Sequence, residues 1–274
     1  MRVFSRLKQV LSGGRSNVPS ALDPIPTFRC NLCGVHSTSA IELTRMREEV
    51  SCQSCGSTLR LRTLASAISS FVYGEPRVLE ECPPRADISG VGLSDHAALA
   101  ALLEMKFNYT NTYFHKNPKL DIAECADSGY RDLDFIVSSD VFEHVAPPVA
   151  RGFANARRLL RTGGRLFFSV PYVPTGDTVE HYPELFEFTI EKAGESYILR
   201  NRTRDGRTQT FENLIFHGGP GTTLEMRLFA LQDLRGQFTA AGFREPRLLN
   251  DHLPEFGIDW NGEHCSIPMV AEAC

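Results

Sequence analysis

The sequence predicts an α/β protein in which a small cysteine-rich module precedes a doubly wound, mostly parallel sheet. Two Cys-x-x-Cys pairs lie near the N-terminus, and from residue 77 onward strand-like segments alternate with helix-like ones. The 274 residues suffice for one large domain and one small one. We expect an N-terminal segment over 1–27, a metal-binding ribbon with its linking helix over 28–73, and an α/β domain over 74–274.

The composition excludes several classes of protein. Hydrophobic residues make up 42% of the chain and the net charge is −4, so the strongly basic balance of nucleic-acid binders is absent. No apolar run approaches the ~18 residues that a membrane span needs. Residues 1–11 lack the apolar core of an export signal. We therefore expect a cytoplasmic protein with no transmembrane segment and no nucleic-acid partner.

Four cysteines predict a structural zinc site, because they form the pattern C-x2-C-x18-C-x2-C and supply four thiolates: Cys30, Cys33, Cys52 and Cys55. Gly34 and Gly56 follow the two pairs, where a knuckle backbone often needs a positive φ. A redox motif or two unrelated pairs is the alternative, but a redox motif would not be duplicated with matched glycines. Four thiolates leave no open coordination position, so the ion should hold structure.

A helix is predicted over 58–72, directly after the second cysteine pair. Its apolar residues recur at helical spacing and give it one face to bury. Arg60 and Arg62 lie at its start. We expect them to be solvated, with anion binding as the alternative.

Seven segments are strand candidates, namely 77–81, 109–115, 119–122, 132–139, 165–170, 243–249 and 266–271. Helices are predicted over 95–105, 148–161 and 224–241, the last with a capping box at Thr222 and Glu225. Ligands of a doubly wound sheet bind beyond the carboxyl ends of its strands. The expected site therefore lies in the loops that follow residues 81, 115, 122, 139 and 170.

The stretch 132–172 resembles the middle of the class I S-adenosylmethionine-dependent methyltransferases of type 11. The matching pieces are LDF at 133–135, VFEH at 141–144, RLLRTGG at 158–164 and VP at 170–171, with QFTAAGF at 237–243. The resemblance covers about 77–174 and 224–272. CQSCGSTLRLR at 52–62 is similar to a subset of that family with an N-terminal zinc ribbon. The resemblance implies a Rossmann-like, doubly wound sheet of seven strands and S-adenosylmethionine as cofactor.

The resemblance also implies where the cofactor binds. The family's first strand runs into a glycine-rich turn, whereas this chain has Cys82-Pro83-Pro84 after its first predicted strand, as the zinc-ribbon subset tends to. Asp121 and Ile122 resemble a residue pair of the family that lies near the cofactor's adenine, where the acid accepts from the exocyclic amine. A turn or cap role is the alternative for Asp121. The predicted cofactor contacts are Glu80, Cys82, Pro83, His115, Asp121, Ile122, Ser139 and Asp140.

About 50 residues between 171 and 222 are more than the core needs, and we expect this insert to cover the site and define the substrate. Asp205-Gly206 between alternating segments predicts a hairpin. Its four arginines could be solvated or could attract an acidic substrate: Arg200, Arg202, Arg204 and Arg207.

Methyl transfer to oxygen or nitrogen requires alignment of the two reactants and removal of a proton. Histidine titrates near the pH that this task needs. The candidate bases are His144, His181 and His217, and a packed ring without a chemical role is the alternative for each.

The sequence thus favours S-adenosylmethionine-dependent methyl transfer to an oxygen or nitrogen of a small molecule such as a sugar, a lipid or a natural product. Three alternatives stay open. The chain could methylate a macromolecule docked by the ribbon. It could be a catalytically silent binding protein, as the missing glycines suggest, or an α/β enzyme that uses the cleft for other chemistry. The oligomeric state is not predicted.

Overall fold

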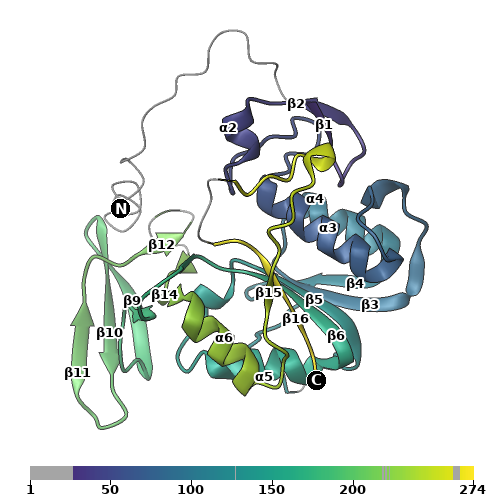
Figure 1. Ribbon diagram of the computed structural model, residues 1–274. Helices are drawn as coiled ribbons and strands as arrows, with labels where there is room; N and C mark the ends of the chain where they lie inside the picture. Colours follow the sequence, from purple (N-terminus) through teal and green to yellow (C-terminus); the bar gives the residue numbers. More distant parts are fainter. Residues whose placement is uncertain (1–26, 127, 218, 220, 222, 262–265) are drawn as a thin grey trace.

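A computed structural model describes residues 27–126, 128–217, 219, 221, 223–261 and 266–274 (Figure 1). Of the predicted N-terminal segment, residues 1–26 lie outside the described part. The body is a six-stranded sheet with strand order β15-β16-β6-β5-β3-β4. Helices cover both faces of the sheet, which confirms the predicted doubly wound α/β class.

The centre of the sheet is parallel and its far edge is antiparallel. The parallel strands are β3 (Arg85–Leu93), β4 (Phe107–Thr112), β5 (Leu133–Ser139) and β6 (Leu160–Ser169). β16 (Met269–Glu272) and β15 (Arg247–Leu248) follow as antiparallel neighbours. The chain runs from β3 to β4 on one side and then crosses to β5 on the other. The switch point, where such sheets bind ligands, therefore lies between β3 and β5.

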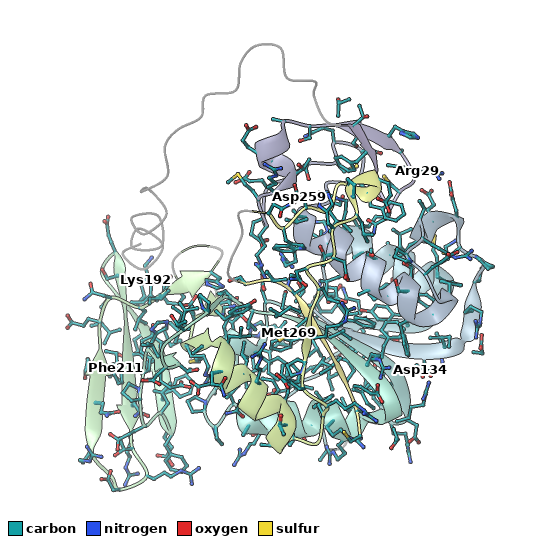
Figure 2. All side chains as sticks on the ribbon, in the orientation of Figure 1. Arg29, Asp134, Lys192, Phe211, Asp259 and Met269 are labelled. Carbon is teal, nitrogen blue, oxygen red and sulfur yellow. The ribbon has the colours of Figure 1, made fainter. Side chains whose placement is uncertain are left out.

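Alternating side chains of the sheet bury against opposite helix layers. Phe135 and Val137 pack with α3 (Leu59–Tyr73) and α4 (Ala97–Lys106). Ile136 and Phe168 pack with α5 (Ala150–Leu159) and α6 (Leu231–Ala240). The side chains fill both layers densely (Figure 2). Since burial on both faces is what a central parallel strand requires, the unbroken apolar run of β5 is explained.

The prediction of a first strand at 77–81 is wrong. Leu79–Glu81 forms a short 3-10 helix (η1), and the first strand of the sheet is β3. The backbone amides of Leu79 and Glu80 donate to the carbonyls of Asn31 and Leu32 in the first knuckle, over 2.8 and 3.2 Å. The ribbon thus satisfies the hydrogen bonds that a sheet neighbour was expected to satisfy.

The prediction of seven strands is also wrong, because the described residues give the main sheet six. The segment 119–122 makes only an isolated bridge, between Tyr113 and Lys119. The segments at 132–139, 165–170 and 266–271 do form strands of the sheet, whereas the one at 243–249 is reduced to the two residues of β15.

The cysteine-rich module packs on the outer side of α3 and α4. It contains β1 (Thr27–Arg29), β2 (His36–Thr38) and the short helix α2 (Ile41–Thr44), and β1 pairs antiparallel with β2. Phe28 and Leu32 of the module join the core between these two helices and the sheet. The expectation that Arg62 is solvated is wrong. Its side chain is fully buried and donates to the carbonyls of Ser57 and Gly257 over 3.1 and 2.9 Å.

The insert forms small sheets at the side of the main body (Figure 1). β9 (Glu187–Ala193), β10 (Ser196–Arg202) and β11 (Thr208–Phe211) make one of them, and the turn at 203–207 confirms the predicted hairpin. The remaining strands are β7 (Tyr172–Val173), β8 (Val179–Glu180), β12 (Phe216–His217), β13 (Thr223–Leu224) and β14 (Arg227–Ala230).

The prediction of a helix from residue 224 onward is wrong for its first part, since α6 begins at Leu231. Residues 223–230 instead contain β13 and β14, and Glu225 between them and Arg227 at the start of β14 are buried. The Arg227 guanidinium donates to the carbonyls of Phe142 and Val145 over 2.9 and 2.6 Å. Glu225 therefore caps no helix, and Thr222 lies outside the described residues. In the described part of the chain, every helix is too short or too polar to cross a membrane.

Candidate functional site

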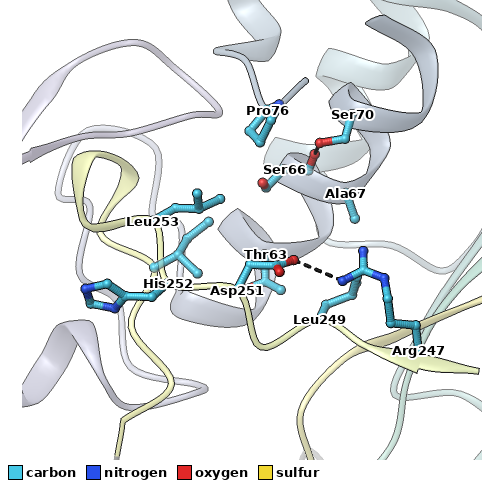
Figure 3. Close-up of a pocket in the computed structure, with 11 residues that line it drawn as sticks. Thr63, Ser66, Ala67, Ser70, Pro76, Arg247, Leu249, Asp251, His252 and Leu253 are labelled. Atoms are coloured by element: carbon cyan, nitrogen blue, oxygen red, sulfur yellow. Dashed lines mark hydrogen bonds and ion pairs between the residues drawn. The ribbon is translucent and has the colours of Figure 1, made fainter. Parts of the chain in front are cut away.

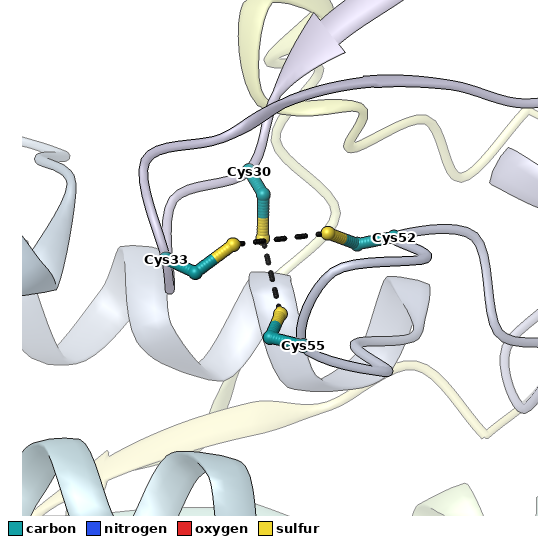
Figure 4. A group of neighbouring side chains, drawn as sticks. All are labelled: Cys30, Cys33, Cys52 and Cys55. Carbon is teal, nitrogen blue, oxygen red and sulfur yellow. Dashed lines mark hydrogen bonds between the residues drawn. The ribbon is translucent and has the colours of Figure 1, made fainter.

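The four predicted zinc ligands come together in one cluster (Figure 4). The sulfur atoms of Cys30 and Cys55 are 3.6 Å apart, and those of Cys33 and Cys52 are 3.8 Å apart. These distances are far beyond the ~2.05 Å of a disulfide. A zinc ion with Zn–S bonds of about 2.3 Å needs sulfur atoms roughly 3.8 Å apart at the corners of a tetrahedron. The cluster therefore fits a four-thiolate metal site.

The backbone of each knuckle is built for this cluster. The amides of Gly34 and Gly56 donate to the carbonyls of Cys30 and Cys52 over 2.8 and 2.9 Å, and both glycines have a φ of 71°. That left-handed conformation suits glycine, as predicted. The Ser37 hydroxyl donates to the Cys52 sulfur over 3.1 Å, the kind of second contact that orients a metal ligand.

Two arginines of the cysteine-rich part reach the carboxyl end of β5. The Arg47 guanidinium donates to both carboxylate oxygens of Asp140 over 3.0 and 2.5 Å. Arg60 donates to the hydroxyl of Ser139 and pairs with Glu48. Burial opposes ionisation of Asp140, but the charges of Arg47 and Arg60 outweigh it and lower the pKa of this carboxyl. Arg60 is thus not solvated as expected, and neither arginine was predicted to be part of the site.

The loop after β3 carries a buried carboxyl group that the sequence analysis missed. Asp95 accepts a hydrogen bond from the Tyr109 hydroxyl through Oδ2, while its Oδ1 has no hydrogen-bond partner. Burial raises the pKa of Asp95 to about 7, although the bond from Tyr109 acts against the rise. A Cβ at Gly92 would lie 2.1 Å from the Tyr109 oxygen and 2.2 Å from Oδ2 of Asp95. The stretch SGVGLSD was the available signal, but the first strand had been assigned upstream of it.

Two of the predicted histidines meet on one buried glutamate. His181 Nε2 lies 2.8 Å from Oε1 of Glu225, and His217 Nε2 contacts Oε2 of the same carboxylate. β12 and β13 position His217 and Glu225 beside each other. Burial opposes ionisation of Glu225, but the hydrogen bonds from His181 and His217 lower the pKa of its carboxyl to about 2.

The third predicted histidine, His144, lies in the same cluster. It belongs to the short helix η2 (Phe142–His144), which follows β5. Its Nδ1 is 2.8 Å from the Leu224 carbonyl oxygen, and its ring is edge-on to the His217 ring at 4.7 Å. Burial lowers the pKa of His144. The structure thus brings His144, His181 and His217 together, although 73 residues separate the first from the last.

Glu143 is at the centre of this cluster and is fully buried. Its Oε1 is 3.7 Å from His144 Nε2 and 3.9 Å from His217 Nδ1, and neither carboxylate oxygen has a hydrogen-bond partner. Burial, with repulsion from Asp140, raises the pKa of Glu143 well above its ordinary value. Glu143 and Glu225 were not predicted as site residues.

The predicted cofactor contacts do not all lie at the carboxyl edge. Glu80, Cys82 and Pro83 precede the amino end of β3, so the reason for choosing them, a strand that ends at residue 81, does not hold. Ser139 and Asp140 do lie at that edge. His115 is exposed in the loop after β4.

The predicted adenine pair takes part in local structure. The Asp121 carboxylate accepts a hydrogen bond from the Ala123 amide over 2.9 Å, which is the turn role left open as an alternative. Ile122 is buried in the core.

The arginines of the insert hairpin are balanced by acids. Arg200, Arg202 and Arg207 form exposed ion pairs, with Glu191, Glu187 and both Asp205 and Glu184 respectively. Arg204 lies over the Phe186 ring. This pairing weakens the argument for an acidic substrate.

Two surface cavities lie away from the cluster of histidines around Glu143 and Glu225. One, of about 430 Å³, opens between α3 and the segment 247–258, where Arg247 pairs with Asp251 (Figure 3). The other, of about 530 Å³, lies beside α6 and β8. Neither is lined by Glu143, His144, His181, His217 or Glu225.

Residues 86–168 match the family model of a methyltransferase domain. The chain thus contains a region that is similar to methyltransferase domains. The matched range spans β3 to β6, and so includes the loops that carry Asp95 and Asp140 at the switch point. No curated protein sequence matches the chain.

Solved methyltransferases are similar to this chain at low identity. A sugar N-methyltransferase from Streptoalloteichus sp. is 17% identical over 77% of this chain and 87% of its own, with a TM-score of 0.41. An amino pentose methyltransferase from Micromonospora echinaspora is 13% identical over 80% and 93%, with a TM-score of 0.44. A methyltransferase from Clostridium acetobutylicum is 14% identical over 68% and 83%, with a TM-score of 0.41.

Proposed function

We propose that this chain transfers the methyl group of S-adenosylmethionine to an oxygen or nitrogen of a small molecule. The observation that carries the proposal is the meeting of His144, His181 and His217 next to the carboxyl end of β5. An acceptor hydroxyl or amine must lose a proton when it is methylated, and a neutral histidine held by a carboxylate is suited to take it. The Glu225 carboxylate contacts two of these rings, those of His181 and His217.

The methionine end of the cofactor fits the polar groups at the switch point. That end carries a cationic amine, a sulfonium and a carboxylate. Asp95 and Asp140 offer acids at the ends of β3 and β5, and the partnerless Oδ1 of Asp95 is an acceptor in need of a donor. Arg47 and Arg60 offer guanidinium groups for the carboxylate. In this proposal the cysteine-rich module contributes directly to the cofactor site.

The four cysteines bind one structural zinc ion in this proposal. The sulfur separations and the matched glycines support it, and the closed ligand set supplies no position for chemistry. The ion holds the segment that presents Arg47 and the start of α3.

The transfer step is an in-line displacement. The acceptor's lone pair attacks the methyl carbon, the C–O or C–N bond forms, and the C–S bond breaks with its electron pair left on sulfur. The proton of the acceptor passes to a histidine nitrogen. His181 is 10% exposed and His217 26%. An acceptor atom must therefore enter a largely enclosed space, which favours a small molecule over a docked macromolecule.

The test is turnover with a panel of aminosugars, phenols and hydroxylated lipids, followed through formation of S-adenosylhomocysteine. We expect acceptor-dependent formation that falls by about 10²-fold or more in His181→Ala, with cofactor affinity unchanged. Formation at the same rate in His144→Ala, His181→Ala and His217→Ala would contradict the histidine assignment. Cofactor binding without turnover on any acceptor would favour a silent binding protein.

A further inference from the structure

The Glu143 carboxylate lies close to the rings of two histidines, His144 and His217. Of the groups around it, His144 Nε2 and His217 Nδ1 are nearest, at 3.7 and 3.9 Å from the same Oε1. Within the described residues, no arginine or lysine forms an ion pair with this carboxylate. A fully buried carboxylate without donors is costly, and a bound cation would offset that cost.

The outer nitrogens of the two rings determine what the inner nitrogens can do. His144 Nδ1 lies 2.8 Å from the Leu224 carbonyl oxygen, which only accepts, so this nitrogen carries the proton. His217 Nε2 contacts the Glu225 carboxylate and carries its proton for the same reason. In the neutral rings, His144 Nε2 and His217 Nδ1 then carry lone pairs, and they lie 3.7 and 3.9 Å from Glu143 Oε1. These two nitrogens and the Glu143 carboxylate lie close together.

We propose that Glu143, His144 and His217 bind a divalent transition-metal ion, separate from the four-cysteine site. The three ligand atoms lie within 4.8 Å of one another. An ion about 2.1 Å from each needs them roughly 3.0–3.5 Å apart, so the two separations from Glu143, 3.7 and 3.9 Å, would contract by less than about 1 Å. Zinc-type ions accept two imidazoles and one carboxylate with an open position.

The surroundings of the three ligands support this assignment. Metal-bound histidines usually donate their other N–H to a carbonyl or carboxylate, and here both do so. The nearby carboxylates Asp140 and Glu225 add negative charge, which favours a cation. Asp140 is already balanced by Arg47. Glu225 is held by His181 and His217. Glu143 is therefore the carboxylate whose buried charge a cation would balance.

The site leaves coordination positions for a water molecule or an acceptor hydroxyl, which a bound ion would polarise. With His217 as a ligand, His181 is the histidine on Glu225 that remains to accept a proton. Binding of the ion does not depend on the methyl transfer proposed above, so either statement can fail alone.

The test counts metal ions in the full chain. The protein is incubated with excess zinc chloride, freed of unbound metal on a desalting column, and analysed for zinc by mass spectrometry. We expect two zinc ions per chain in the wild type and one in Glu143→Gln and in His217→Gln. The matched control is His252→Gln, which changes an exposed histidine that lines the cavity of about 430 Å³ beside α3. This variant should keep two zinc ions.

A second variant separates a metal site from a merely structural contact. Glu225→Gln leaves the three ligands in place but weakens the partner of His217, so the second zinc ion should bind about tenfold more weakly in a chelator competition. Melting curves without added zinc verify that each variant folds. One zinc ion per folded wild-type chain, or two ions retained by both Glu143→Gln and His217→Gln, would overturn the proposal.

Discussion

Arg47 and Asp140 form a two-pronged ion pair between the cysteine-rich module and the end of β5, with N–O distances of 3.0 and 2.5 Å. The Arg47 side chain is 10% exposed and that of Asp140 is 22% exposed, so the pair is largely shielded from water. The sheet end that binds ligands in doubly wound proteins is thus partly built by the cysteine-rich module. The first two predictions depend on this relationship.

Replacing Arg47 should weaken cofactor binding more than it weakens the fold. Arg47→Gln removes the charge that balances Asp140 and that is proposed to face the cofactor's carboxylate. We expect the Kd for S-adenosylhomocysteine to rise by about tenfold, the loss of one charge-assisted contact. Isothermal calorimetry measures it.

The matched control is Arg29→Gln in the same module, which breaks an exposed pair with Glu81 and one hydrogen bond to the Gly34 carbonyl. Exposed pairs contribute little, so its Kd should stay within twofold of the wild type. Equal effects of the two substitutions would show that Arg47 has no special role at the sheet end.

Loss of the zinc ligands should affect both stability and the cofactor site. Cys52→Ser removes one thiolate from a four-thiolate set, and such ions contribute on the order of 10 kcal/mol to the folding of small modules. We expect loss of one zinc ion, a lower melting temperature and weaker S-adenosylhomocysteine binding, because Arg47 and Arg60 lose their support. Cys274→Ser changes an exposed cysteine and should alter none of the three. Zinc content equal to that of the wild type in Cys52→Ser would argue against the ribbon.

The close approach at Gly92 makes a steric prediction. A Cβ there would lie within 2.2 Å of both Tyr109 and Asp95, so Gly92→Ala should destabilise the protein by about 1–3 kcal/mol in urea unfolding. In Gly236→Ala the new Cβ meets nothing within 4 Å, and alanine inside α6 should stabilise by up to about 1 kcal/mol. Stability changes of the same sign at both glycines would contradict this account of the carboxyl end of β3.

The lowered pKa of Glu225 predicts a stability that depends on pH. A carboxyl whose folded-state pKa is below its ordinary value stabilises the fold above that ordinary value and stops doing so as pH falls through the folded pKa. For Glu225 the window runs from about 4.5 down to about 2. The wild type should therefore exceed Glu225→Gln by about 2–3 kcal/mol at pH 5.5, and by clearly less at pH 3.

Urea unfolding at the two pH values measures this difference. The control is Glu212→Gln, which changes an exposed glutamate and should give no pH-dependent difference. A gap between wild type and Glu225→Gln that does not shrink at pH 3 would contradict the assignment.

The sequence was sufficient to predict features that depend on local spacing. The two Cys-x-x-Cys pairs with Gly34 and Gly56 predict the cluster because each knuckle is a local turn. The apolar run of β5, and the alternation of strand-like and helix-like segments around it, predict a sheet covered by helices on both faces. The turn at Asp205-Gly206 predicts a hairpin. Each of these signals lies within a few residues of the structure that it specifies.

Features that depend on long-range contacts were not predictable in the same way. The first strand was predicted at 77–81, upstream of the observed strand with Gly90 and Gly92, where Phe135, Tyr109 and Asp95 approach the backbone. Arg47 and Asp140 are 93 residues apart, and no local pattern couples them. The helix expected from residue 224 failed because the buried contacts of Arg227 hold that segment extended.

Titration of S-adenosylhomocysteine into the folded, zinc-loaded chain tests the central claim most directly. The account predicts one binding site per chain with a micromolar Kd, weakened by Arg47→Gln and unaffected by Arg29→Gln. Absence of any heat of binding from protein that is folded and carries its ribbon zinc would contradict the assignment of the sheet end to this cofactor.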